Sequence, residues 1–164
     1  MSAEKKKQMG VLGLIVALVV VLMGSVVFVG AAAGWFDDPK VVLDAEYSCT
    51  EDCEDLMELT AAGYEELIDA KKSFVVFVDQ GGCTTADRLR GYVQDFAREK
   101  EVRVYRMMFS DMKETSLHDY VKYYPSVVVV GKGVVKAYLR ADSDEDAAIY
   151  NDEQAFMDWI KKYL

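Results

Sequence analysis

The stretch that most constrains this chain is an apolar run followed by turn residues and a cysteine, FVVFVDQGGCTTA at residues 74–86. A short run rich in valine and phenylalanine and bounded by turn residues is typical of a buried strand. Beyond residue 83 the apolar residues recur at the spacing of one helix face: Leu89, Tyr92, Val93, Phe96 and Ala97. The pattern therefore predicts a strand over 74–78 and a helix over 84–100, with Cys83 at their junction.

The position of Cys83 suggests chemistry. The first N–H groups of a helix have no partner within the helix, and the helix dipole favours a negative charge there. A thiol at that position is biased toward the thiolate, which is the reactive form. The alternative is that Cys83 is a small buried residue without chemistry. The preceding pair Gly81-Gly82, which lets another backbone approach closely, favours the reactive alternative.

The N-terminal third indicates export. Residues 8–36 carry no charge, and 11–30 are long enough to cross a bilayer, which takes about 20 apolar residues. Lysines precede this run and aspartates follow it, so the positive-inside rule predicts a cytoplasmic N-terminus and residues 37–164 outside. The alternative is a cleaved signal peptide ending near Ala31-Ala32-Ala33, although the run exceeds the usual apolar region of about 7–15 residues. We expect a basic tail (1–8), a single-pass membrane anchor (9–34), a tether (35–54) and a domain (55–164).

The net charge and the cysteine content limit which partners and cofactors the chain can bind. The chain has 164 residues and a net charge of -9. An acidic domain argues against nucleic acid, because binding phosphates requires a basic face. Three cysteines in an exported protein predict one disulfide, Cys49–Cys53, and one leftover thiol. The alternative makes Cys49 or Cys53 a remote resolving cysteine for Cys83. One histidine and an isolated CxxxC form no zinc site, so we expect no cofactor and no metal.

The remaining elements follow from periodicity and turn chemistry. We expect an edge strand at 55–59, a helix capped by Thr60, a strand over 102–108, a helix over 114–124, a hairpin of 127–130 with 134–139, and a last helix capped by Asn151. An acidic loop precedes that last helix, with Asp142, Asp144, Asp146 and Glu153 at the spacing of an EF-hand calcium loop. Ala147 stands where such a loop needs glycine, which favours a solvated acidic loop.

The order of elements resembles a thioredoxin-like domain over residues 55–164. Three stretches carry the resemblance: LMELTAAGYEELIDAKKSFVVFV as the opening strand–helix–strand, GGCTTA at the family's Trp-Cys-Gly-Pro-Cys, and YPSVVVVGKGVVKAYL as the proline loop and hairpin. The resemblance implies an α/β fold, with a mixed central sheet of about five strands flanked by four helices. The uncharged run adds one N-terminal transmembrane helix before it.

The resemblance also implies a site. Cys83 takes the place of the nucleophilic cysteine, and Pro125 that of the cis-proline facing it. Thr84 or Thr85 would donate a hydrogen bond to the thiolate. Tyr124 and Gly82 would border the substrate groove.

Three departures from the family pattern bear on activity. Ala86 stands at the resolving cysteine, Gly82 at the tryptophan, and Phe77 at the buried acid. Without a second thiol in the motif, a mixed disulfide at Cys83 cannot be resolved from within it.

Three functions are compatible with these residues. The first is a single-thiol redox role, in which Cys83 forms mixed disulfides with exported protein or peptide thiols. The second is a redox-inactive binding or adaptor module that keeps the groove. The third is a peroxidase, because GGCTTA also resembles the Cys-Thr-Thr segment of some peroxiredoxins. That family has a threonine and a proline where this chain has Gln80 and Val76, so we rank the peroxidase last.

Overall fold

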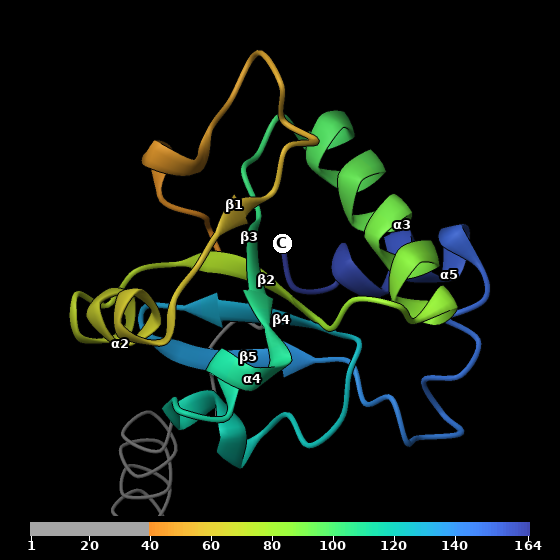
Figure 1. The fold of residues 1–164 in the computed structure, drawn as a ribbon. Helices are drawn as coiled ribbons and strands as arrows, with labels where there is room; N and C mark the ends of the chain where they lie inside the picture. The colour runs from red at the N-terminus through yellow and green to blue at the C-terminus, as the bar shows by residue number, and fades with distance from the viewer. Residues whose placement is uncertain (1–39) are drawn as a thin grey trace, which may run out of the picture. The chain divides into compact units, whose positions relative to one another are not determined.

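The structure is a computed structural model that describes residues 40–164. These residues form a five-stranded mixed sheet with the strand order β1-β3-β2-β4-β5 (Figure 1). The elements are, in chain order, η1 (Ala45–Tyr47), β1 (Met57–Glu58), α2 (Ala61–Asp69), β2 (Phe74–Asp79), α3 (Thr84–Lys100), β3 (Tyr105–Met108), α4 (Phe109–Met112), η2 (Ser116–Asp119), β4 (Ser126–Gly131), β5 (Val134–Tyr138) and α5 (Glu153–Ile160). The predicted α/β class and mixed sheet are confirmed.

Strand β2 lies at the centre of the sheet. It pairs in parallel with β3 and antiparallel with β4, while β1 pairs in parallel with β3 and β5 antiparallel with β4. Every residue of β2 and β4 is buried, so both faces of the sheet are covered.

Successive residues of β2 supply two separate cores, as the alternation of side chains along a strand requires. Val75 and Phe77 pack with residues of α3 and α5 on one face of the sheet. Phe74, Val76 and Val78 pack on the other face with residues of α2 and α4. Figure 1 shows α2 on the opposite side of the strands from α3 and α5. The central apolar run thus fixes both layers around the end of β2, where the cysteine loop begins.

Most local predictions are confirmed. Helix α3 spans Thr84–Lys100, as its periodicity predicts. Thr60 caps α2, because its Oγ1 accepts a hydrogen bond from the Gly63 N–H at 3.1 Å. The edge strand at 55–59 is present as the two residues of β1, and the hairpin is β4–β5.

The predicted helix over 114–124 is wrong. The chain forms the short helix α4 before it and the 3-10 turn η2 within it. Thr115 Oγ1 accepts from the Leu117 N–H at 3.2 Å and donates to the Met112 carbonyl at 2.7 Å, which closes a tight turn instead of a helix. Leu117 is buried but Tyr120 is 43% exposed, so the apolar stripe does not form one continuous packed face.

Two boundaries also differ from the predictions. Strand β3 starts at Tyr105 instead of Val102. Helix α3 ends with Glu101 in the left-handed region (φ 53°), and the next residues pair with the tether: Val102 forms a bridge with Ser48, and the Arg103 N–H donates to the Tyr47 carbonyl at 2.7 Å. Helix α5 is capped by Asp152 instead of Asn151, since Asp152 Oδ1 accepts from the Ala155 N–H at 2.9 Å. The Asn151 amide donates instead to the Ala147 carbonyl at 2.9 Å.

The predicted anchor at 9–34 lies outside the described residues. Within residues 40–164, no helix has the length and apolarity to span a bilayer. The described part of the predicted tether packs on the domain: Val41, Tyr47, Cys49 and Cys53 are buried, and the Cys49 N–H donates to the Glu101 carbonyl at 2.9 Å.

Candidate thiol site at the start of helix α3

Cys83 is the N-cap residue of the 17-residue helix α3. Its backbone is extended (φ -112°, ψ 117°), its side chain makes no capping hydrogen bond, and its thiol is free and partly exposed. The turn that precedes it depends on Gly82, whose φ of +83° lies in the left-handed region that favours glycine. The sequence Gly-Gly-Cys therefore places a free thiol at the start of a long helix.

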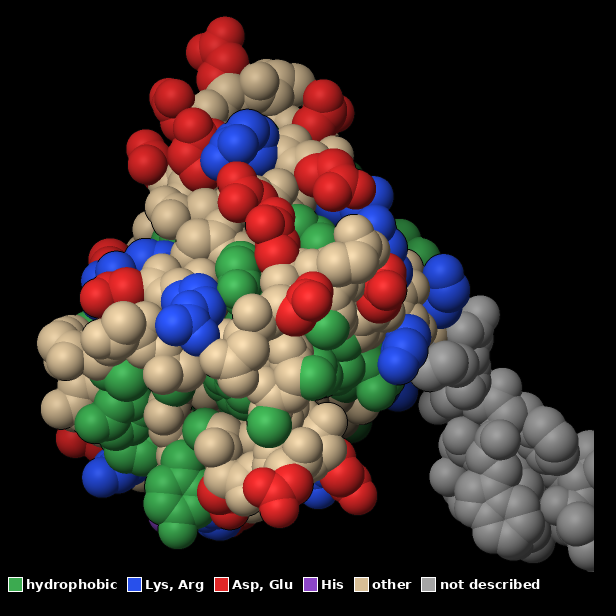
Figure 2. All heavy atoms as spheres, turned by 90° about the vertical axis from the view of Figure 1, so that its right-hand side faces the viewer, with side chains coloured by type: hydrophobic (Ala, Val, Ile, Leu, Met, Phe, Trp, Pro, Cys, Tyr) green, Lys and Arg blue, Asp and Glu red, His purple; other side chains and the backbone are tan. Residues whose placement is uncertain are grey.

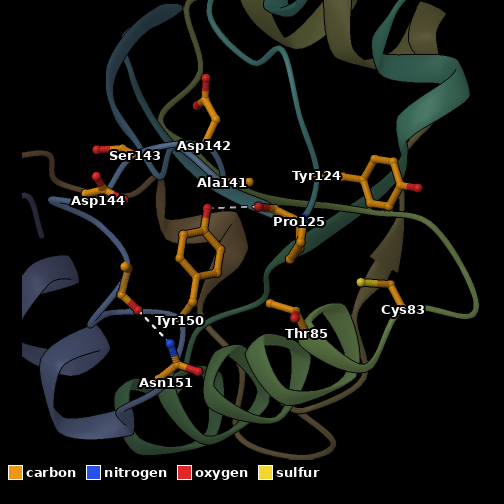
Figure 3. A pocket seen from close by; sticks show the side chains of 11 residues that line it. Cys83, Thr85, Tyr124, Pro125, Ala141, Asp142, Ser143, Asp144, Tyr150 and Asn151 are labelled. Atoms are coloured by element: carbon orange, nitrogen blue, oxygen red, sulfur yellow. Dashed lines mark hydrogen bonds between the residues drawn. The ribbon is translucent and has the colours of Figure 1, made fainter.

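A cavity of about 400 Å³ opens beside this thiol. Its walls come from three segments: the start of α3, the loop before β4, and the acidic loop before α5 (Figure 3). The residues that line it are Cys83, Thr85, Tyr124, Pro125, Ala141, Asp142, Ser143, Asp144, Ala147, Tyr150 and Asn151.

The fold brings together most of the residues proposed for the site. The same cavity is lined by Cys83, Thr85, Tyr124 and Pro125. The Tyr124–Pro125 peptide bond is cis, as the resemblance implies. Thr84 and Gly82 are exposed and do not line the cavity. Of the two threonines, Thr85 is therefore the one placed to meet a ligand beside the thiol.

Tyr150 is a member of the site that the sequence did not indicate. Its hydroxyl donates to the Pro125 carbonyl at 2.9 Å, and this contact joins the acidic loop to the proline loop (Figure 3). Burial, followed by the nearby carboxylates of Asp146 and Asp142, raises the pKa of Tyr150, so the hydroxyl keeps its proton at neutral pH.

The acidic loop has two kinds of carboxylate. Glu145 and Asp146 bind the Arg140 side chain at 2.7 and 3.3 Å, and these contacts raise the pKa of that guanidinium. Asp142 and Asp144 line the cavity instead. Across residues 40–164, no group of three or more His, Cys, Asp or Glu side chains could hold a metal ion, so the calcium-loop alternative gains no support.

A second missed feature lies just before the cysteine loop. Asp79, the last residue of β2, is fully buried and binds Arg106 of β3 through Nε at 3.0 Å and Arg90 of α3. Arg106 continues to Glu58 at 2.9 Å, and Arg90 to Asp87 at 3.0 Å. Phe77, which the resemblance puts at the family's buried acid, packs in the apolar core instead.

The other two cysteines are not available as thiols. Cys49 and Cys53 form the predicted disulfide, with Cα atoms 5.8 Å apart, and both side chains are buried. Ala86, at the resolving position, is also fully buried. Since the chain has three cysteines, Cys83 is its one free thiol.

Comparisons with known proteins identify the fold of the domain. No model of a known protein family matches the chain, and no curated protein matches it either. Among solved structures it is similar to a thioredoxin pre-protein of Schistosoma mansoni, at 16% identity over 67% of this chain and 99% of that one, with a TM-score of 0.51. It is also similar to mitochondrial thioredoxin 3 of Saccharomyces cerevisiae, at 14% identity over 65% of this chain and 93% of that one, with a TM-score of 0.50. Together with the sheet order and the strand–cysteine–helix junction, these matches show that the domain has the thioredoxin-like fold.

Proposed function

We propose that Cys83 acts as a single nucleophilic thiol, forming mixed disulfides with exported proteins or peptides that bind beside Pro125. One observation carries this proposal: the free thiol at the start of α3 and the Tyr124-Pro125 loop line the same cavity. The thiol lies where the first N–H groups of the helix have no partner within the helix, and the thiolate is the form of a cysteine that attacks disulfides.

The proposed reaction is thiol–disulfide exchange. Cys83 loses its proton to solvent and attacks one sulfur of a partner disulfide. A bond then forms between Cys83 and the partner, the partner's own S–S bond breaks, and its other sulfur leaves as a thiolate. In the second step another thiolate, from the partner or a small-molecule thiol, attacks the partner's sulfur and releases Cys83.

The outside thiol is needed because this chain has none to offer. Ala86 is at the resolving position, and Cys49 and Cys53 are bonded to each other. The net result is rearrangement of the partner's disulfides or exchange with a small thiol, with no net oxidation or reduction of Cys83.

The same residues favour a second candidate, a binding module without redox chemistry. The observation that favours it is the buried Ala86 at the resolving position. Without a resolving thiol in the motif, the domain still has the groove in which a partner could bind. In that case the domain would bind its partners equally well with serine in place of Cys83.

We also place this activity outside the cytoplasm, with residues 9–34 as a membrane anchor. The uncharged run and its flanking lysines support this placement, and so does the Cys49–Cys53 disulfide, which suits an oxidising compartment. Protease added to sealed, right-side-out vesicles should remove residues 37–164. Protection of these residues until the vesicles are opened would contradict the placement.

The chemistry is tested with the full chain and a short peptide whose cysteine carries a coloured thiol leaving group. We expect colour release with wild type and none with Cys83→Ser. Thr85→Val should slow the release several-fold, because a hydroxyl in the cavity is lost, whereas Thr84→Val should leave it unchanged, because Thr84 does not line the cavity. Equal rates for wild type and Cys83→Ser would overturn the redox proposal.

A further inference from the structure

The cavity beside Cys83 carries a charge that the proposed exchange reaction does not explain. Two of its lining residues, Asp142 and Asp144, are acidic, and no lysine, arginine or histidine lines it. Both aspartates are exposed at the rim of the cavity, on the loop that Tyr150 holds against the proline loop (Figure 3).

These two carboxylates differ from their neighbours. Glu145 and Asp146 both bind the guanidinium of Arg140, whereas within residues 40–164 no hydrogen bond or ion pair engages the side chains of Asp142 and Asp144. Arg88 does not line the cavity; its guanidinium donates a hydrogen bond at 2.6 Å to Oδ1 of the lining residue Asn151. The loop thus pairs the carboxylates outside the cavity and leaves those at the cavity unpaired.

The surroundings strengthen this local field. The net charge of the chain is -9. Because residues 1–34 carry +2, the remaining residues together carry -11. Figure 2 shows acidic side chains spread over one face of the domain, with Lys and Arg side chains among them. A cleft lined by one sign of charge concentrates ligands of the opposite sign and speeds their association.

From this cavity wall we infer the substrate class: Cys83 reacts with disulfide-bonded cysteines that basic residues flank, in extended peptide segments whose lysine or arginine side chains meet Asp142 and Asp144. The inference rests on the proposed thiol chemistry and adds to it a selection by charge. The peptide cysteine lies over Cys83 beside Pro125, and its basic neighbours lie against the acidic loop.

The test compares short peptides with the same activated cysteine, flanked by lysine, glutamine or glutamate. Each reacts with the full chain at low ionic strength, and colour release gives the rate. Wild type should prefer the lysine peptide over the glutamate peptide by about tenfold. The preference should shrink as salt is added, since about 0.1 M salt screens exposed charges beyond about 10 Å.

Two double variants decide whether these carboxylates are responsible. Asp142→Asn with Asp144→Asn should reduce the preference to about twofold, with little effect on the glutamine peptide. Glu66→Gln with Asp69→Asn, on the exposed surface of α2, removes the same charge away from the cavity and should retain the preference. Equal rates for all peptides with wild type, or an equal loss of preference in both double variants, would overturn the inference.

Failure of the inference is separable from failure of the thiol chemistry. Reaction with every peptide at the same rate contradicts the charge selection and leaves the exchange reaction standing. If no peptide reacts, the redox proposal fails, and binding of the same peptides with serine for cysteine then tests the charge selection alone. Tighter binding of the lysine peptide, lost in Asp142→Asn with Asp144→Asn, would support it, and equal binding of all peptides would overturn it.

Discussion

Replacing Asp79 by asparagine should cost this domain more stability than removing any surface ion pair. The Asp79 carboxylate is fully buried and binds Arg106 at 3.0 and 3.3 Å, and it also binds Arg90. Losing one partner of a buried pair typically costs about 3–5 kcal/mol. Here the two arginine side chains are 25% and 28% exposed and keep Glu58 and Asp87, so we expect a loss at or just below the lower end of that range, about 2–3 kcal/mol.

Urea unfolding of the full chain, followed by tryptophan fluorescence, measures this change, since Trp159 is buried in the described domain. Asp95→Asn is the matched control. The pair of Asp95 with Arg98 is 2.7 Å long but its side chains are 42% and 61% exposed, so the loss should stay below about 1 kcal/mol. Hydrogen exchange at residues 80–83 should also quicken in Asp79→Asn, because the network joins the end of β2 to α3 and β3. A loss for Asp79→Asn no larger than for Asp95→Asn would refute the reasoning.

Three further outcomes are expected. Tyr150→Phe removes the hydrogen bond to the Pro125 carbonyl and should lower the unfolding free energy by about 1 kcal/mol in urea titrations; no change would mean that the contact does not hold the acidic loop. Phe156→Ala empties a fully buried site and should cost about 3–5 kcal/mol, whereas Val134→Ala, at a residue 53% exposed, should stay within about 0.5 kcal/mol; similar losses would contradict the assigned core. Burial, then the charge of Glu65, raises the pKa of Tyr64 to about 12, against about 10 in the unfolded chain. Tyr64 therefore contributes fully below pH 10 and loses its contribution as pH rises toward 12, at up to about 1.4 kcal/mol per pH unit, so Tyr64→Phe should show a shallower alkaline loss of stability than wild type.

The centre of the fold could be predicted because local and global signals agree there. The run over β2 is apolar on both faces, and α3 carries a regular stripe with glycines before it, so neither element has a competing interpretation. The position of Pro125 beside Cys83 came from the family resemblance, since residues 42 apart in sequence carry no local signal of contact.

The errors lie where tertiary contacts override periodicity. The stripe at 114–124 has helical spacing, but the hydrogen bonds of the Thr115 side chain close a tight turn, and no continuous helix forms there. The contacts of Asp79 with Arg90 and Arg106, and that of Tyr150 with Pro125, join residues between 11 and 27 apart along the chain, which no motif records. The acidic composition of 141–151 predicts a solvated connection, and nothing in its sequence indicates that it forms one wall of the cavity.

The most direct test of the central claim is to locate the adduct after the full chain reacts with a peptide mixed disulfide, once as folded protein and once in denaturant. Mass spectrometry of the digested protein identifies the modified cysteine. The account predicts an adduct on Cys83 with Cys49–Cys53 intact, formed faster in the folded chain than in the unfolded one. Labelling of Cys83 only after unfolding would contradict a prepared thiol at the start of α3, and the cavity would then be a binding site without redox chemistry.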